Sequence, residues 1–189
     1  MLSELRDKRP FEWRYNLGKS HRKRAHIMPE NPLFFAWLAG FIDGEGCFKI
    51  AVKKNPVTGI GFEAMPCIDI CQGIARKSKM ETLATKLGQS GLTERHSRMG
   101  GNMFSININR VEDVKALINA VYPYLYIKKD EAEVFIEILK AITCGKHLTV
   151  DGFLEIVRLR EKLSPLRTKP KTYRNYLWFQ NYFKNKEVA

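Results

Sequence analysis

The stretch Leu33-Phe-Phe-Ala-Trp-Leu-Ala-Gly-Phe-Ile-Asp-Gly-Glu-Gly46 decides the fold of this chain. Its first ten residues are apolar throughout, and Asn31-Pro32 just before them is a helix-start signal. A surface helix has a polar face and this segment has none, so we predict a helix that is buried on all sides. Small residues recur at every fourth position, at Ala36, Gly40 and Gly44. Such a stripe lets a second helix approach closely, and another copy of the same helix is the natural partner; the alternative is a core helix that is merely rich in glycine.

After Gly46 the sequence period changes to two. Phe48, Ile50 and Val52 alternate with Lys49, Ala51 and Lys53, which predicts a strand with one apolar and one basic face. A turn follows, and a second alternating strand is expected over residues 62–72, weakened locally by Pro66. The remaining elements are expected as a helix at 76–88, a hairpin of strands 91–98 and 102–110, a helix at 111–121, an extended link at 122–126, a helix at 130–142 and a helix opening near Val150 with Asp151 as its N-cap.

This order of elements predicts an α+β fold of the type αββαββα, followed by a further helix and a helical C-terminal tail. Four antiparallel strands would carry helices on one face, and the other face would be a wide, polar and partly basic saddle. Two-stranded ribbons fit the major groove of DNA, where strand side chains read base edges. We place a basic arm at residues 1–30 and one domain at residues 31–189, with a basic, aromatic tail over about 158–189.

The charge balance points to a polyanionic partner. The chain has 32 Lys+Arg against 20 Asp+Glu among 189 residues, a net charge of +12, which favours DNA, RNA or an anionic surface. The polar N-terminus does not resemble a secretory signal, and no apolar run approaches the roughly 20 residues of a membrane span. We therefore expect an intracellular protein without a membrane partner, and its four irregularly spaced cysteines are interpreted as free thiols.

The segment Leu38-Ala-Gly-Phe-Ile-Asp-Gly-Glu-Gly46 closely resembles the signature of the LAGLIDADG homing endonucleases. The resemblance extends to Ile70-Cys-Gln-Gly-Ile-Ala-Arg76 and Pro123-Tyr-Leu-Tyr-Ile-Lys-Lys-Asp-Glu-Ala132, and more weakly to Gly152-Phe-Leu-Glu-Ile156 and Arg167-Thr-Lys-Pro-Lys-Thr172. The arm at 1–30 lies outside it. Only one signature is present, and it resembles the single-motif, intron-encoded branch, which implies a homodimer acting on a long, pseudo-palindromic DNA site.

The resemblance also implies the chemistry. Glu45 and the backbone carbonyl of Gly44 are expected to bind Mg²⁺, a cation that takes oxygen ligands from one or two carboxylates, phosphate and water. Mn²⁺ is expected to substitute for it, and Ca²⁺ to support binding without cleavage. By the same resemblance Asp43 orients the helix end, Gln72 positions the hydrolytic water, and Lys128 and Arg76 supply positive charge near the phosphate.

Strand parity selects the residues expected to contact DNA. These are Lys49, Ala51, Lys53, Asn55, Glu63, Met65, Cys67 and Asp69 on the first two strands, Arg95, Arg98, Asn102, Ser105 and Asn107 on the hairpin, and Arg167, Lys169 and Lys171 in the tail. A one-residue slip in register would exchange every strand assignment. The dimer interface is expected to contain Ala36, Trp37, Gly40, Phe41 and Gly44.

The function implied by the resemblance is site-specific, Mg²⁺-dependent cleavage of both DNA strands across the minor groove, leaving short 3′ overhangs. Two other functions of the same fold stay open: an RNA maturase that assists splicing of its intron, and a DNA-binding regulator that does not cut. The host compartment is expected to be an archaeal cytoplasm, a chloroplast or a mitochondrion.

Overall fold

The computed structural model describes residues 31–89, 91–96, 101–163 and 174–187. By their contacts these residues form two compact units. The first unit contains the described residues up to Cys47 together with Ile68–Lys129, and the second contains Phe48–Cys67 together with those from Asp130 onward. The arm predicted at 1–30 lies outside the described residues.

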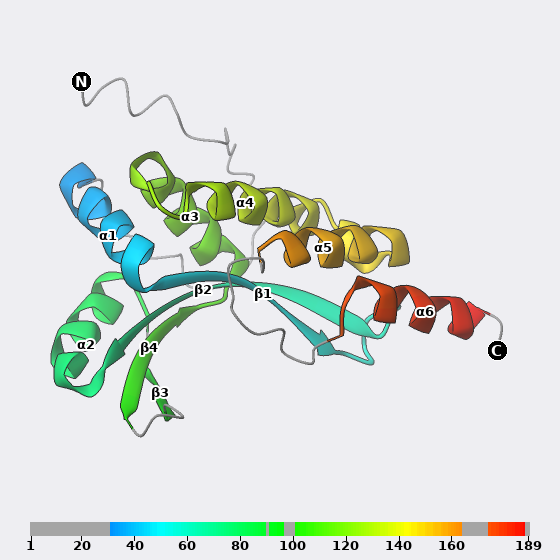
Figure 1. Ribbon diagram of the computed structural model, residues 1–189, viewed down its shortest axis with the longest axis horizontal. Helices are drawn as coiled ribbons and strands as arrows, with labels where there is room; N and C mark the ends of the chain where they lie inside the picture. Colours follow the sequence, from blue (N-terminus) through cyan, green and yellow to red (C-terminus); the bar gives the residue numbers. More distant parts are fainter. Residues whose placement is uncertain (1–30, 90, 97–100, 164–173, 188–189) are drawn as a thin grey trace, which may run out of the picture. The chain divides into compact units, whose positions relative to one another are not determined.

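The elements follow the predicted order (Figure 1). They are α1 (Pro32–Glu45), β1 (Gly46–Lys54), β2 (Phe62–Gly73), η2 (Ile74–Arg76), α2 (Lys77–Lys86), β3 (Thr93–His96), β4 (Asn102–Ile108), α3 (Val111–Val121), η3 (Tyr122–Tyr124), α4 (Lys129–Thr143), η4 (Lys146–Leu148), α5 (Val150–Lys162) and α6 (Tyr176–Glu187).

The four strands form one sheet in the order β1-β2-β4-β3. In the first unit β4 pairs antiparallel with both of its neighbours, so that Ile70 lies opposite Ile106 and Arg95 opposite Met103. In the second unit β1 and β2 are joined by a turn that the Asn55 N–H closes on the Gly61 carbonyl, 2.9 Å away. The predicted α+β class and four-stranded antiparallel sheet are confirmed.

The first unit is built on α1. The Asn31 side chain caps the helix by accepting hydrogen bonds from the N–H groups of Leu33 (3.1 Å) and Phe34 (3.3 Å), and Pro32 supplies the fixed φ favoured at a first helical position. One side of α1 contacts α3 and η3, as Figure 1 shows for α1 (blue) and α3 (green). Its core combines apolar residues from both helices and from the sheet, namely Leu38, Ile42, Ile68, Ile70, Ile106, Ile108, Leu117 and Ile118.

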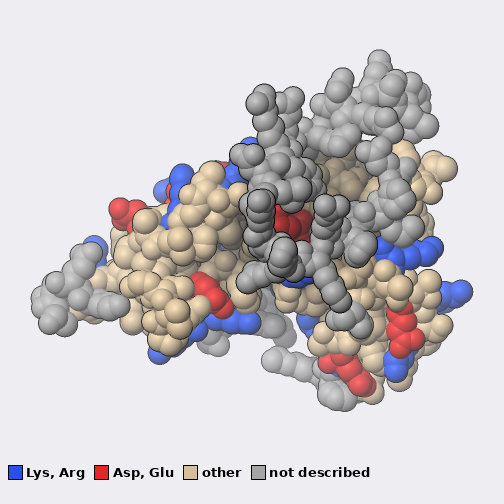
Figure 2. All heavy atoms as spheres, turned by 180° about the vertical axis from the view of Figure 1, so that it is seen from behind, with Lys and Arg blue, Asp and Glu red and all other residues tan. Residues whose placement is uncertain are grey.

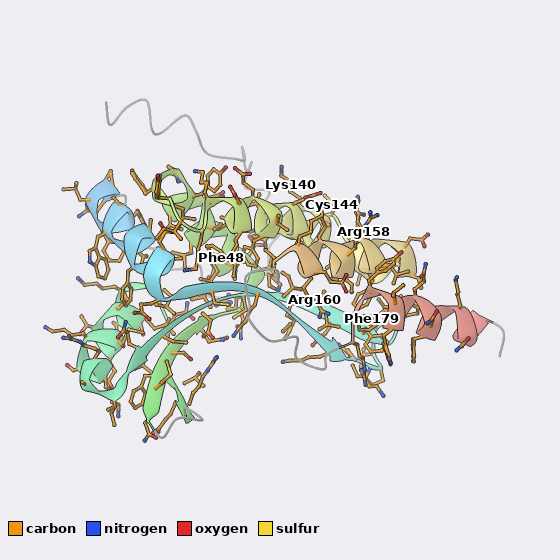
Figure 3. All side chains as sticks on the ribbon, viewed as in Figure 1. Phe48, Lys140, Cys144, Arg158, Arg160 and Phe179 are labelled. Carbon is orange, nitrogen blue, oxygen red and sulfur yellow. The ribbon has the colours of Figure 1, made fainter. Side chains whose placement is uncertain are left out.

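The second unit is held by an aromatic core. Phe48 on β1 stacks on Phe135 of α4, with ring centroids 5.3 Å apart. Phe62 on β2 contacts Phe153 of α5 and Phe179 of α6, at 5.9 and 5.1 Å. Figure 3 labels Phe48 and Phe179 in this interior, whereas Lys140 of α4 and Cys144, just after that helix, are exposed. Because burying aromatic side chains is strongly favourable, this cluster attaches the C-terminal helix α6 to the ribbon.

Two local predictions were wrong. Residues 122–124 form the short helical turn η3 instead of an extended link. The N-cap of α5 is Thr149, whose Oγ1 accepts from Gly152 N at 3.2 Å, while Asp151 lies in the first turn. Helix α1 is buried on one side in the single chain, where Leu33, Trp37, Gly40 and Gly44 are exposed, so burial of its other side by a second copy stays a prediction. Within the described ranges, no helix has the length and apolar character that crossing a membrane requires.

Gly152 is the position where α5 passes closest to η4. A Cβ added there would lie 2.2 Å from the Lys146 carbonyl oxygen, a backbone atom. Replacing Gly152 by Ala should therefore lower the free energy of unfolding by about 1–3 kcal/mol, the usual cost of overpacking. Thermal or urea unfolding measures this loss. Gly59→Ala is the matched control, because a Cβ at Gly59 meets nothing within 4 Å; equal losses in both variants would contradict the packing argument.

Candidate active site and nucleic-acid interface

The end of α1 carries the signature acid. Gly44 and Glu45 form the last turn and are exposed. The chain then passes directly into β1 at Gly46, where an added Cβ would lie 2.7 Å from the Ile42 carbonyl oxygen. Only glycine allows this abrupt change from helix to strand. The transition fixes where the Glu45 carboxylate leaves the helix.

Asp43 ties this helix end to a segment far along the chain. Its buried carboxylate accepts hydrogen bonds from the backbone N–H groups of Tyr126 (2.8 Å), Ile127 (3.1 Å) and Lys128 (2.9 Å). A buried carboxylate is tolerated when its oxygens are satisfied in this way. These contacts give Asp43 the orienting role expected of it.

Lys128 is brought to the same helix end. Its Nζ donates to the Ile42 carbonyl at 3.1 Å and also to the Asp43 carbonyl. The C-terminal carbonyls of a helix carry partial negative charge, so the ammonium group stabilises them. The ammonium group of Lys128 therefore lies at the carbonyls of Ile42 and Asp43, the two residues that precede Gly44 and Glu45 in the sequence. Gly44 and Glu45 are the residues predicted to bind metal.

Gln72 and Arg76 lie beyond this contact. Gln72 is near the end of β2, opposite Phe104 of β4, and Arg76 ends the short helix η2 that follows the strand. The side chains of both residues make no hydrogen bond or ion pair within the described part of the chain. Both belong to the first unit together with Glu45 and Lys128, but among the described residues no hydrogen bond or ion pair joins either of them to these two residues.

The donor set at the helix end fits a hard cation only in part. Glu45 offers carboxylate oxygens and Gly44 a helix-end carbonyl, which are the oxygen ligands that Mg²⁺ prefers. Among the described residues, however, no three His, Cys, Asp or Glu side chains cluster as a metal site. These two residues would supply only part of a coordination shell, and a bound cation would need further oxygen ligands from a second chain, DNA or water.

Exposed apolar residues lie on α1 and on the loop that Asp43 holds. Trp37 is 55% exposed and stacks on Phe41, with centroids 5.6 Å apart. Tyr126 and Ile127 are 89% and 75% exposed. A Cβ added at Gly40 or Gly44 would meet nothing within 4 Å. All five predicted interface residues, Ala36, Trp37, Gly40, Phe41 and Gly44, are at least partly exposed, whereas sequence reasoning did not include Tyr126 and Ile127.

In the second unit the predicted DNA-facing residues of the ribbon share one side of β1 and β2. Lys53 is exposed, and Lys49, Ala51, Asn55, Glu63 and Met65 are half-buried, while Cys67 is buried. The Asn55 amide is engaged at both ends: Nδ2 donates to Glu63 Oε2 at 2.7 Å, and Oδ1 accepts from Val57 N at 3.1 Å. The amide of Asn55 therefore fixes the turn in this structure, and Lys53 is the most accessible basic residue of the group.

In the first unit the register places Asp69, Asn107, Ser105 and Arg95 on the same face. Asp69 and Ser105 are buried, so their side chains are not accessible to DNA in this structure. Asn102 shares the parity of Phe104 and lies on the other face, where its Nδ2 donates to Glu94 at 2.9 Å. Arg98, Arg167, Lys169 and Lys171 lie outside the described residues. Figure 2 shows both signs of charge interspersed among the described side chains of the face in view.

A four-stranded sheet of this order, with a carboxylate at the end of the first helix, is the arrangement of the DNA-cleaving LAGLIDADG fold. The family model described as LAGLIDADG endonuclease matches residues 38–141. The chain belongs to the LAGLIDADG endonuclease family.

Relatives and solved structures agree with this assignment. The chain is 27% identical over 128 residues to a probable intron-encoded endonuclease 3 of Neurospora crassa, a match that covers 67% of the chain and about a quarter (24%) of that protein. It is 21% identical over 136 residues to DNA endonuclease I-CreI of Chlamydomonas reinhardtii, covering 72% of the chain and 80% of that protein.

Two solved structures show the same fold. The archaeal intron-encoded homing endonuclease I-Vdi141I complexed with DNA matches with a TM-score of 0.69 and 20% identity, over 85% of this chain and 100% of that one. The homing endonuclease I-CvuI, in complex with the I-CreI target in the presence of 2 mM Mg, matches with a TM-score of 0.68 and 20% identity, over 83% and 96%.

Replacing Asp43 by Ala should release the loop at residues 126–128. Three backbone N–H groups would lose their acceptor, at a cost of about 3 kcal/mol in the free energy of unfolding. Hydrogen exchange followed by NMR should show faster exchange at the amides of Tyr126, Ile127 and Lys128. Asp151→Ala, on an exposed helix turn, is the control and should leave these amides protected. Unchanged protection in Asp43→Ala would show that the carboxylate does not hold the loop.

Proposed function

We propose that the protein is a homodimeric, site-specific endonuclease that cuts both strands of DNA in a Mg²⁺-dependent reaction. The observation that carries the proposal is the exposed apolar face of α1, whose last turn presents Glu45. The exposed carboxylate lies at the edge of a surface that one chain leaves uncovered. A second copy placed on that surface brings two such carboxylates together.

The interface is formed by the apolar residues of α1 and of the loop at 126–127. Gly40 and Gly44 allow the two α1 helices to approach closely, because no side chain separates their backbones. Trp37 and Phe41 stack beside this contact and supply most of its apolar area. Tyr126 and Ile127, which are presented by the Asp43 hydrogen bonds, extend the surface toward the site.

At the site, Glu45 and the Gly44 carbonyl would hold Mg²⁺ together with the partner chain, the scissile phosphate and water. The cation would activate a water and neutralise charge that develops on the phosphate. Lys128 stabilises the carbonyl end of α1 and provides positive charge beside the phosphate. Gln72 orients the hydrolytic water and Arg76 adds a second positive charge, roles that suit side chains with no hydrogen bond or ion pair to the other described residues.

DNA would lie along the sheet, with sequence read from the strands. Lys53 and Lys49 of β1 suit backbone phosphates, which fix the position of the protein on the duplex without selecting a sequence. Because such contacts release counterions, affinity should fall steeply as salt rises. A twofold dimer implies a long, pseudo-palindromic site, cut across the minor groove with short 3′ overhangs. We further propose an intracellular enzyme that cuts the intronless form of its host gene.

Replacing Glu45 by Gln should abolish cleavage while preserving DNA binding. Loss of the charged metal ligand should slow strand cutting by about three orders of magnitude. The substrate is a duplex that joins the two flanks of the intron insertion point, incubated with Mg²⁺ for cutting and with Ca²⁺ for binding.

Glu137→Gln, on the exposed side of α4, is the matched control and should cut normally. Undiminished cutting by Glu45→Gln would refute the assignment of Glu45. Binding without cutting by the unmodified protein would instead indicate a non-catalytic regulator.

Replacing Gly40 by Leu should separate the dimer. The larger side chain would block close approach of the two α1 helices, whereas the single chain should stay folded because leucine favours a helix by about 1 kcal/mol over glycine. Sedimentation equilibrium should show two chains per particle for the wild type and one for the variant. Gly59→Leu, in an open turn of the second unit, should remain dimeric. A dimeric Gly40→Leu protein would place the interface elsewhere.

A further inference from the structure

Asp69 is the most deeply buried acidic side chain on the face of the sheet assigned to DNA. The residue is 3% exposed and lies on β2, opposite Asn107 of β4. Its Oδ2 is 2.8 Å from Nη2 of Arg95, which comes from β3, and its Oδ1 accepts from Asn107 Nδ2 at 3.4 Å. Both carboxylate oxygens are therefore engaged by donors from neighbouring strands.

The ion pair is strongly asymmetric. The Asp69 side chain is 4% exposed, whereas the Arg95 side chain is 41% exposed. A buried carboxylate without a partner is costly, so Asp69 requires Arg95 to stay over it. The guanidinium group has five N–H donors in one rigid plane. A contact through Nη2 anchors one nitrogen of the guanidinium over the sheet and leaves the other N–H donors available to a ligand.

Arg95 has to cross β4 to make this contact. The register places it opposite Met103, and Asp69 lies on the far side of β4 opposite Asn107. Ser105, the residue of β4 between these two positions on the same face, is small and fully buried. The Arg95 side chain is thus extended over the sheet face instead of projecting freely from its edge.

We propose that Asp69 is a positioning residue that holds Arg95 as a reader of guanine in the major groove, an inference that rests on the proposed function. Guanine presents two acceptors, O6 and N7, which an arginine plane contacts as a pair. A phosphate is the weaker fit, because the adjacent carboxylate cancels the long-range attraction of the guanidinium and repels an anion. Exposed Lys53 is the better phosphate contact. Direct contact of Asp69 with DNA, as first expected, is replaced by this indirect role.

The test compares base preferences at each position of the site. Duplexes recovered by the wild-type protein from a randomised pool serve as the probe, together with every single-base substitution, and binding is measured with Ca²⁺ so that no cutting occurs. Asp69→Asn should reduce discrimination for guanine by about tenfold at one position of each half-site. Preferences at the other positions should change less than twofold.

Arg95→Lys provides a second, milder variant in case Asp69→Asn fails to fold. It should reduce the preference for guanine at the same position of the half-site. The double variant should discriminate for guanine at that position as well as either single variant does, because both substitutions disrupt the same contact between Arg95 and guanine. Glu155→Gln is the matched control. It breaks the ion pair between Lys146 and Glu155, whose side chains are 54% and 48% exposed, and it should leave every preference unchanged.

Three results would overturn the proposal. An unchanged base profile in folded Asp69→Asn would show that the ion pair does not position a reader. An equal loss of binding affinity for every base at every position, with a lower melting temperature, would show that the ion pair only stabilises the packing of the strands. Recovery of no preferred sequence by the wild-type protein would refute site-specific recognition itself, and so separates failure of the proposed function from failure of this inference.

Discussion

Helix α1 has more apolar surface than the described part of the chain buries, and the proposed site depends on this excess. Leu38, Ala39 and Ile42 pack inward and are fully buried, while Leu33 and Trp37 on the other side remain exposed. A helix that is apolar on both sides needs partners on both sides. In the first unit one side is covered by α3 and η3. The proposed second copy covers the other, and the acid at the helix end enters the site only through that contact.

The helix end is positioned by polar contacts that complement this apolar packing. Asp43 accepts three backbone hydrogen bonds from a loop about 85 residues away in sequence, and Lys128 from the same loop contacts the last carbonyls of the helix. Each partner satisfies a group that would otherwise be buried without a hydrogen bond. One loop therefore holds the end of α1, brings Lys128 to it and carries the exposed residues Tyr126 and Ile127.

Much of this fold could be predicted from the sequence because its signals are local. The start of α1 follows from Asn31 and Pro32, and the faces of β1 follow from the alternation of Phe48 and Ile50 with basic residues. The Gly-rich helix also predicts a contact between copies, and this contact stays a prediction. The order of elements then required little more than counting periods of two and of 3.6 residues.

Other features depended on contacts between distant segments and could not be predicted. Sequence placed Asp69 and Asn55 on the DNA face by parity, but it could not show that Arg95 and Glu63 engage them. The exposed loop at Tyr126 and Ile127 is held by hydrogen bonds to Asp43. Hydrophobic periodicity in the sequence does not reveal such contacts between distant residues. Thr149 and Asp151 can both cap a helix, and the sequence does not show that the Gly152 N–H is donated to Thr149 Oγ1.

The most direct test of the account is the number of chains in the functional complex. Native mass spectrometry of the wild-type protein bound to its site duplex in Ca²⁺ should give two chains per duplex, and addition of Mg²⁺ to that species should cut both strands. A complex of one chain per duplex that cuts both strands when Mg²⁺ is added would contradict the claim that α1 completes the site by docking on its own copy.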